Sequence, residues 1–188
     1  MGIKISKGNS KIGNIPNISL VPIKDCGNCS ACKTKCYALK AYRQYPGVRN
    51  AWNINSEAFR KDPWEATNEV LDFINKHDSK YFRIHVAGDF LNQDHFNAWE
   101  NLCAIKHDCH FMVNTKMFDL NYAYHSPNMH IRFSMWPGQL IPESYMPKAW
   151  VQDGSEMRIP ADAIECAGNC DKCLVCYETN KDVFFHIH

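Results

Sequence analysis

The stretch that decides the fold is Ile18-Ser-Leu-Val-Pro-Ile-Lys-Asp-Cys26-Gly-Asn-Cys29-Ser-Ala-Cys32-Lys-Thr-Lys-Cys36-Tyr37, an apolar run that leads straight into four cysteines. The cysteine spacing, C-x2-C-x2-C-x3-C, is typical of thiolate runs that hold 4Fe–4S clusters. Thiolates this close in sequence converge on one metal centre without closing a long loop. The stretch therefore predicts a β-strand over residues 18–23 that ends in a metal-binding loop.

A second run, Cys166-Ala-Gly-Asn-Cys170-Asp-Lys-Cys173-Leu-Val-Cys176, has the reverse spacing, C-x3-C-x2-C-x2-C. Zinc held by four thiolates is the alternative metal, but zinc ribbons usually take two C-x2-C pairs from separate hairpins. Disulfides are a third alternative, disfavoured because no export signal is recognisable. We therefore expect iron–sulfur ligation at both runs, and we expect Cys103 and Cys109, which lie outside them, to be core residues.

Charge and hydropathy exclude some classes of protein. The 188 residues include 21 Lys and Arg against 20 Asp and Glu, a formal net charge of +1. This balance does not indicate a nucleic-acid partner or a membrane surface, although it leaves a local patch open. No apolar run reaches the roughly 18 residues of a membrane span, and the N-terminus lacks the apolar core of a signal peptide. We expect a cytoplasmic protein, in the host cytoplasm if the gene is viral.

Short apolar segments alternate with amphipathic ones along the chain. Strands are expected at residues 18–23, 82–87, 110–114, 129–134, 149–151 and 157–159, and helices at residues 37–45, 63–76, from Asn92 onward and near 116–124. Pro46-Gly47 is expected to end the helix over 37–45, and Asn92 to cap the helix that follows it.

This alternation of expected strands and helices predicts a single α/β domain over residues 1–188, with a parallel sheet that is open or partly closed into a (β/α) barrel. Residues 1–160 would form the barrel core and residues 161–188 a cysteine-rich extension. Ligands of such folds bind at the carboxyl ends of the strands. The first cysteine run and Gly88-Asp89 both follow strands, so we expect them to share one edge of the sheet.

Several short motifs occur in one order along nearly the whole chain: Gly8-Asn9-Ser10-Lys11, Cys32-x3-Cys36-Tyr37-Ala38, Phe82-Arg-Ile-His-Val-Ala-Gly-Asp-Phe90, Asn114-Thr115-Lys116 and Ile131-Arg132-Phe133-Ser134. Together with the closing cysteine run they resemble the bacteriophage gene-product-eighty-eight family. That pattern looks like a shortened radical-SAM core.

The radical-SAM resemblance implies a 4Fe–4S cluster held by Cys26, Cys32 and Cys36, with one open iron that chelates S-adenosylmethionine. The spacing of these three, C-x5-C-x3-C, departs from the usual C-x3-C-x2-C, and Cys29 is an additional thiol. If Cys29 ligates the cluster, no iron is open; if it does not, the radical-SAM interpretation stands.

The same resemblance implies roles for five further residues. Gly88 and Asp89 would meet the amino group of S-adenosylmethionine, Ser134 its ribose or carboxylate, and Lys116 a carboxylate. Tyr37 is the aromatic residue that follows the last cysteine. The structural alternatives are a turn that closes a strand at Gly88-Asp89 and a solvated lysine at Lys116. The C-terminal run, Cys166, Cys170, Cys173 and Cys176, would hold an auxiliary cluster.

Three functions stay open. The first is a radical-SAM enzyme of unknown small-molecule or macromolecular substrate, with a reductase or host protein as partner. The second is a non-catalytic iron–sulfur protein for redox sensing, electron transfer or host interaction. The third is a zinc-stabilised binding module. His85 is expected to be a core histidine with a hydrogen-bonded ring.

Overall fold

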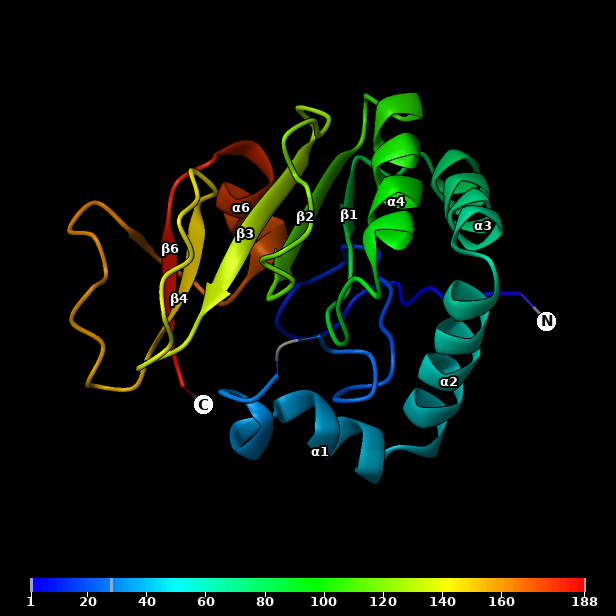
Figure 1. Cartoon of the computed structure of the whole chain (residues 1–188). Helices are drawn as coiled ribbons and strands as arrows, with labels where there is room; N and C mark the ends of the chain where they lie inside the picture. Colours follow the sequence, from blue (N-terminus) through cyan, green and yellow to red (C-terminus); the bar gives the residue numbers. More distant parts are fainter. Residues whose placement is uncertain (1, 28, 188) are drawn as a thin grey trace.

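The computed structural model describes residues 2–27 and 29–187 as one α/β domain. Its sheet has six strands, all parallel, in the order β1-β2-β3-β4-β6-β5. The strands are β1 (Tyr81–Arg83), β2 (His110–Thr115), β3 (Met129–Met135), β4 (Lys148–Gln152), β5 (Ile164–Glu165) and β6 (Val183–His186). The sheet curls into a half-barrel with helices packed around it (Figure 1), which confirms the expected fold class.

Helices cover the sheet and extend past one end of it. They are η1 (Lys33–Lys35), α1 (Tyr37–Gln44), α2 (Pro46–Lys61), α3 (Pro63–His77), α4 (Gln93–Ile105), α5 (Cys170–Cys173) and α6 (Val175–Glu178). The Asn92 side chain caps α4 by accepting from the His95 N–H, as expected. Helix α2 was not anticipated: Pro46 does not only end α1 but occupies the first turn of the next helix, where a missing N–H is tolerated.

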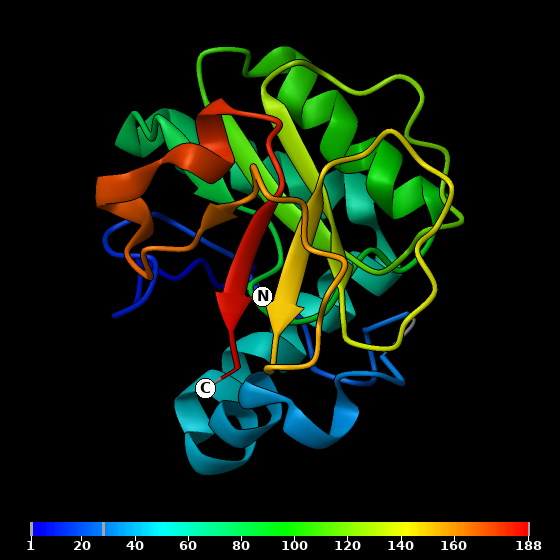
Figure 2. The ribbon, with the colours of Figure 1, turned by 90° about the vertical axis from the view of Figure 1, so that its left-hand side faces the viewer.

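The two faces of the sheet have different partners because side chains alternate along each strand. Phe111, Val113, Ile131 and Phe133 point into the main core beneath α3 and α4. Met112 points to the opposite, inner face, where it packs against Tyr177 of α6. Figure 2 shows α4 on one side of the sheet and the orange and red C-terminal helices on the other.

The expected strand over residues 18–23 is not a regular strand, although it lies where a first strand would. Ile18 N donates to Arg83 O at 3.3 Å, Val86 N to Ile18 O at 3.1 Å and Leu20 N to Ala87 O at 2.8 Å. The pairing is irregular because β1 ends at Arg83 and His85 adopts a left-handed φ of 48°. The expected strand over 82–87 is correspondingly shortened.

Three further expectations were wrong. Residues 116–124 form no helix: Met117 N bonds to the Thr115 hydroxyl and Met117 O accepts from the Tyr122 hydroxyl, so side chains take the backbone groups that a helix would use. Residues 157–159 form no strand; the strands that follow β4 are β5 and β6. Residues 161–188 are more than an extension, because β5 and β6 belong to the sheet and β6 pairs with β4.

Within the described parts of the chain, no helix combines the length and apolar character needed to cross a bilayer.

Candidate functional site

The first cysteine run begins on a rigid anchor, Asp25. Its buried carboxylate accepts from Val21 N at 3.0 Å and from the Ser56 hydroxyl at 2.5 Å, and it forms an ion pair with Arg60. Ser56 and Arg60 both lie on α2, so this helix fixes the backbone immediately before Cys26.

Backbone N–H groups point at two thiols of the run. Ile23 N donates to Cys26 Sγ at 3.3 Å, and Leu39 N donates to Cys36 Sγ at 3.4 Å, where Cys36 caps the N-terminus of α1. Hydrogen bonds to sulfur stabilise thiolate and tune the potential of iron–sulfur clusters. The local fold therefore provides donors that a thiolate ligand set can use.

The pKa values of the thiols in this run depend on the neighbouring thiols and on two charged residues at the same edge of the sheet. Burial raises the pKa of Cys26 to about 11 and also raises the pKa of Cys32. The Lys116 ammonium opposes both shifts, whereas the Asp89 carboxylate adds to that of Cys26. The Cys29 thiol contributes to the rise at both neighbours, so it lies close to Cys26 and Cys32.

Asp89 is 4% exposed and connects the chain after β1 to the end of β2. Its Oδ1 accepts from Phe90 N at 2.8 Å and the Thr115 hydroxyl at 2.7 Å, and its Oδ2 from Lys116 N at 2.7 Å. Burial raises the pKa of Asp89, and these bonds oppose the rise. Asp89 N in turn donates to Asp25 O at 2.7 Å, which confirms that the first run and Gly88-Asp89 share the carboxyl edge.

Gly88 has a structural requirement of its own. Its φ is +81°, and a Cβ there would lie 2.6 Å from the Leu20 Cβ. The glycine thus permits the sharp approach of this turn to residues 18–20, just upstream of the cysteine loop.

Tyr37 and Lys11 lie between the two cysteine runs. The Tyr37 hydroxyl donates to Val86 O at 2.5 Å, and the Lys11 ammonium is 5.9 Å from the centroid of the Tyr37 ring. Lys11 O accepts from Cys170 N at 3.3 Å. The N-terminal loop therefore contacts both the residue after Cys36 and the second run.

The structure does not bring Ser134 into this group. It is buried on the inner face of β3, opposite Ala149 of β4, and none of the hydrogen bonds described above joins it to the first run. The structure therefore links Gly88, Asp89, Lys116 and Tyr37 to the first run, but not Ser134.

The second run lies between β5 and β6, so it precedes the last strand instead of following a completed sheet. Cys166, Cys170, Cys173 and Cys176 line one pocket whose surface is almost wholly apolar. Arg132, fully buried on β3, holds the backbone of this segment against the sheet. Its guanidinium donates to Cys176 O at 2.9 Å, Thr179 O at 2.6 Å and Lys181 O at 3.0 Å.

Arg83 of β1 acts on the second run and on Tyr37, the residue that follows the first run. Burial raises the pKa of Cys170 to about 11 and raises that of Cys176, and the Arg83 guanidinium opposes both shifts. The same charge acts on the Tyr37 hydroxyl, whose pKa burial raises. Each run thus faces a cation at or just after the end of a strand, Lys116 after β2 for the first run and Arg83 of β1 for the second.

The ligand geometry itself is not preformed. All ten cysteines are free thiols, and among residues 2–27 and 29–187 no three His, Cys, Asp or Glu side chains are grouped closely enough for one metal ion. Cys103 and Cys109 are buried core residues, as expected. His85 is also buried, but the expected ring hydrogen bonds are absent from the described chain: both nitrogens lack partners amid the rings of Phe59, Phe90 and Trp99.

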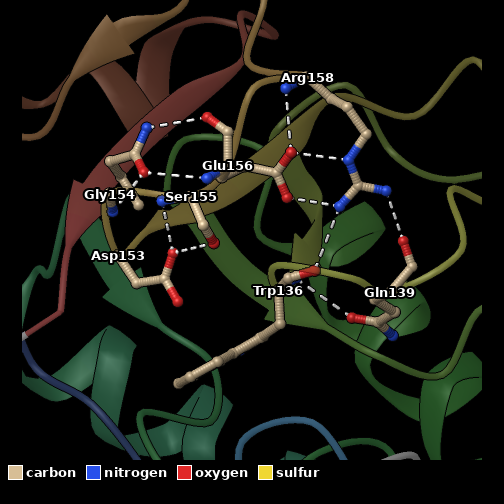
Figure 3. A network of polar contacts seen from close by, with 8 residues as sticks. Trp136, Gln139, Asp153, Gly154, Ser155, Glu156 and Arg158 are labelled. Carbon is tan, nitrogen blue, oxygen red and sulfur yellow. Dashed lines mark hydrogen bonds and ion pairs between the residues drawn. The ribbon is translucent and has the colours of Figure 1, made fainter.

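A polar network joins the loops that follow β3 and β4 at the carboxyl edge (Figure 3). Glu156, 5% exposed, forms an ion pair with Arg158, whose guanidinium also donates to Gln139 O at 2.6 Å and Trp136 O at 3.4 Å. Because the Glu156 and Arg158 charges are paired with each other, this part of the network supports the two loops.

Sequence reasoning missed Asp25, Arg60, Arg83 and Arg132. The sequence contained a signal for Arg83 and Arg132, because each interrupts an apolar strand at a position that faces the inner side of the sheet. Nothing local to the sequence marked Asp25 and Arg60, which are 35 residues apart.

Comparison with known protein families identifies a match. A family model described as gene product 88 matches residues 3–137. No curated protein and no solved structure matches the chain.

Proposed function

The chain belongs to the gene product 88 family, and from that premise we propose that it is an iron–sulfur protein whose first cysteine run forms a radical-SAM-like site. Cys26, Cys32 and Cys36 would hold a 4Fe–4S cluster with an open iron, and S-adenosylmethionine would bind beside it. The second run would hold an auxiliary cluster through Cys166, Cys170, Cys173 and Cys176.

One observation carries the proposal: the first cysteine run, Lys116 and Asp89 meet at the carboxyl edge of a parallel half-barrel. Ligands of parallel α/β folds bind at this edge. The donor set suits the group, because iron–sulfur clusters are held by cysteine thiolates. Cations beside thiols whose pKa burial raises would favour the deprotonated ligand form.

The thiols of the first cysteine run would be drawn together by the binding of the cluster. A metal site seldom exists complete before the metal binds, and the binding free energy then orders the ligands. The Asp25 anchor fixes the start of the loop and the cap of α1 fixes its end at Cys36, so closure requires movement only between them.

A reduced cluster with bound S-adenosylmethionine would supply the electron for reductive cleavage of the sulfonium. The chain's own residues would bind and orient. The Lys116 ammonium would pair with the carboxylate of S-adenosylmethionine. Three internal donors occupy most of the acceptor capacity of Asp89, so its contribution to an ammonium group would be one remaining lone pair. Tyr37, held by its hydrogen bond to Val86 O, would cover the cluster. Ser134 would contact S-adenosylmethionine where the binding site extends onto the inner face of the sheet.

A second candidate is a non-catalytic protein with closed clusters. It is favoured by the position of Cys29, whose thiol acts on both Cys26 and Cys32. If Cys29 is a ligand, the first cluster has four thiolates and serves stability, redox sensing or electron transfer.

The test is anaerobic reconstitution with counts of iron and sulfide, followed by EPR of the reduced protein with and without S-adenosylmethionine. The radical-SAM-like site predicts a change of the EPR signal on addition, retained in Cys29→Ser and lost with the first cluster in Cys26→Ser. Cys103→Ser is the matched control, because Cys103 is a buried thiol outside both runs.

The other outcomes decide among the alternatives. An EPR signal indifferent to S-adenosylmethionine, with loss of the first cluster in Cys29→Ser, would establish closed ligation and overturn the open-iron proposal. Zinc without iron or sulfide in the anaerobically purified protein would overturn both and leave a zinc-stabilised module.

A further inference from the structure

One stretch of the chain, residues 33–52, concentrates positive charge and aromatic rings on η1, α1 and the start of α2. We propose that it forms a binding surface for single-stranded nucleic acid, here called the basic–aromatic surface. Its cations are Lys33, Lys35, Lys40, Arg43 and Arg49, and its aromatic residues are Tyr37, Tyr42, Tyr45 and Trp52.

Charge is strongly segregated onto this stretch. Residues 26–56 contain these five cations and no Asp or Glu, so their net charge is +5. Since the whole chain has a net charge of +1, the remaining residues carry the difference, −4. A near-neutral total thus conceals a local field that attracts polyanions.

Part of the surface is concave. Lys33, Lys40 and Arg43 line an open hollow together with the polar side chains of Thr34 and Gln44. All three cations are exposed, and none has an ion pair within the described chain. Lys40 and Arg43 are three positions apart on α1, which places them on one side of the helix. Such a group of unpaired donors matches the oxygens of a phosphate.

Aromatic residues share this stretch of the chain with the cations, although none of them lines the hollow. Tyr45, at the junction of α1 and α2, is 53% exposed. Tyr42 and Trp52 stack on each other with centroids 6.2 Å apart, and the Tyr42 hydroxyl donates to Asn53 Oδ1 at 2.7 Å, so this pair is fixed. Cations and exposed rings on neighbouring parts of one surface are the elements with which proteins bind single strands, by backbone charge and by base stacking.

The same elements favour a nucleic acid over an acidic protein. Carboxylates would engage the cations but would leave the exposed ring of Tyr45 without a matching planar partner, whereas a single strand offers a phosphate and a base at each step. Cys36 also lines the hollow, so a bound strand would lie beside the first cysteine run. The proposal needs no cluster and is independent of the function proposed above.

The test measures fluorescence anisotropy of a labelled single-stranded oligonucleotide, as DNA and as RNA, of about 15 nucleotides, the upper range of the site size for one small domain. The triple variant K33A/K40A/R43A should weaken binding and reduce the slope of log K against log salt by about 2, because each phosphate contact to a single strand contributes about 0.7. Tyr45→Ala should weaken binding about tenfold, in the range of one lost base stack, with little change in the salt slope.

The matched control K4A/K61A/K76A removes the same charge from exposed lysines outside the surface and should leave the salt slope nearly unchanged. Circular dichroism checks that each variant folds; should the triple variant not fold, K40E alone is read in its place. The absence of binding, equal losses in the triple variant and its control, or equally tight binding of poly-glutamate would each overturn the proposal.

Discussion

Replacing Arg132 with methionine should detach the second cysteine run from the sheet. The guanidinium is 0% exposed and donates to three backbone carbonyls, those of Cys176, Thr179 and Lys181. These carbonyls belong to the end of α6 and the approach to β6. The side chain therefore joins the middle of β3 to the segment that carries the last cysteine.

The size of the effect follows from opposing contributions. Hydrogen bonds from a charged group contribute about 1.5–3 kcal/mol each, so three give an upper range of about 4.5–9 kcal/mol. The burial that lowers the pKa of Arg132 is a cost in the folded protein that methionine does not have. Methionine also keeps apolar contact, and the freed carbonyls gain water as the segment loosens. We expect a net loss of about 3–5 kcal/mol in the free energy of unfolding, as for a broken buried polar network.

Urea denaturation of the metal-free protein measures this loss, and alkylation rates of individual cysteines measure its location. Cys170 and Cys176 should react faster in the variant, whereas Cys26 should not. Arg49→Met is the control, since that exposed arginine has no ion pair in the described chain and surface changes of this kind usually stay within about 0.5 kcal/mol. A loss below about 1 kcal/mol, or equal acceleration at both runs, would contradict the anchoring role of Arg132.

Three further predictions concern the carboxyl edge and the core. Gly88→Ala should destabilise the protein by about 1–3 kcal/mol, because φ is +81° and the new Cβ would lie 2.6 Å from the Leu20 Cβ; a thermal shift measures it, and an unchanged melting temperature would contradict the packing argument. Burial lowers the pKa of His95 to about 3 from the ordinary 6.5, so the stability due to its neutral ring is complete above pH 6.5 and is lost as the pH falls toward the folded value. The slope is about 1.4 kcal/mol per pH unit; urea titrations between these pH values should show a flatter profile for His95→Gln, and parallel profiles would refute the assignment. Arg158→Met should leave the buried Glu156 carboxylate unpaired and cost about 3 kcal/mol near neutral pH. Arg158 lowers the pKa of Glu156, so the cost should shrink as the pH falls and Glu156 is protonated. Urea denaturation at neutral and at acidic pH measures the cost, and an equal cost under both conditions would contradict the ion-pair argument.

Local signals predicted much of the fold. The helices at residues 37–45 and 63–76 and the strands at 110–114 and 129–134 follow from period and capping within a few residues, and the structure contains all four. The helix expected over 116–124 failed because Thr115 and Tyr122 supply side-chain bonds that compete with a helical backbone.

Some features of the candidate site could likewise be predicted from the sequence, and others could not. The two cysteine runs and the meeting of the first run with Gly88-Asp89 could be read from the sequence, because parallel strands place their carboxyl ends at one edge. The buried state of Asp89 could not be read, since its partners Thr115 and Lys116 come from the next strand.

The sequence by itself thus determined an α/β chain with two thiol-rich loops, because period, capping and cysteine spacing act over neighbouring residues. Only the tertiary structure decided that the second run precedes the last strand, that Arg132 holds it on the inner face, and that Arg83 acts on both the second run and Tyr37. Parallel pairing joins residues dozens of positions apart, and the direction of a buried charge depends on which carbonyls and thiols that pairing brings to it.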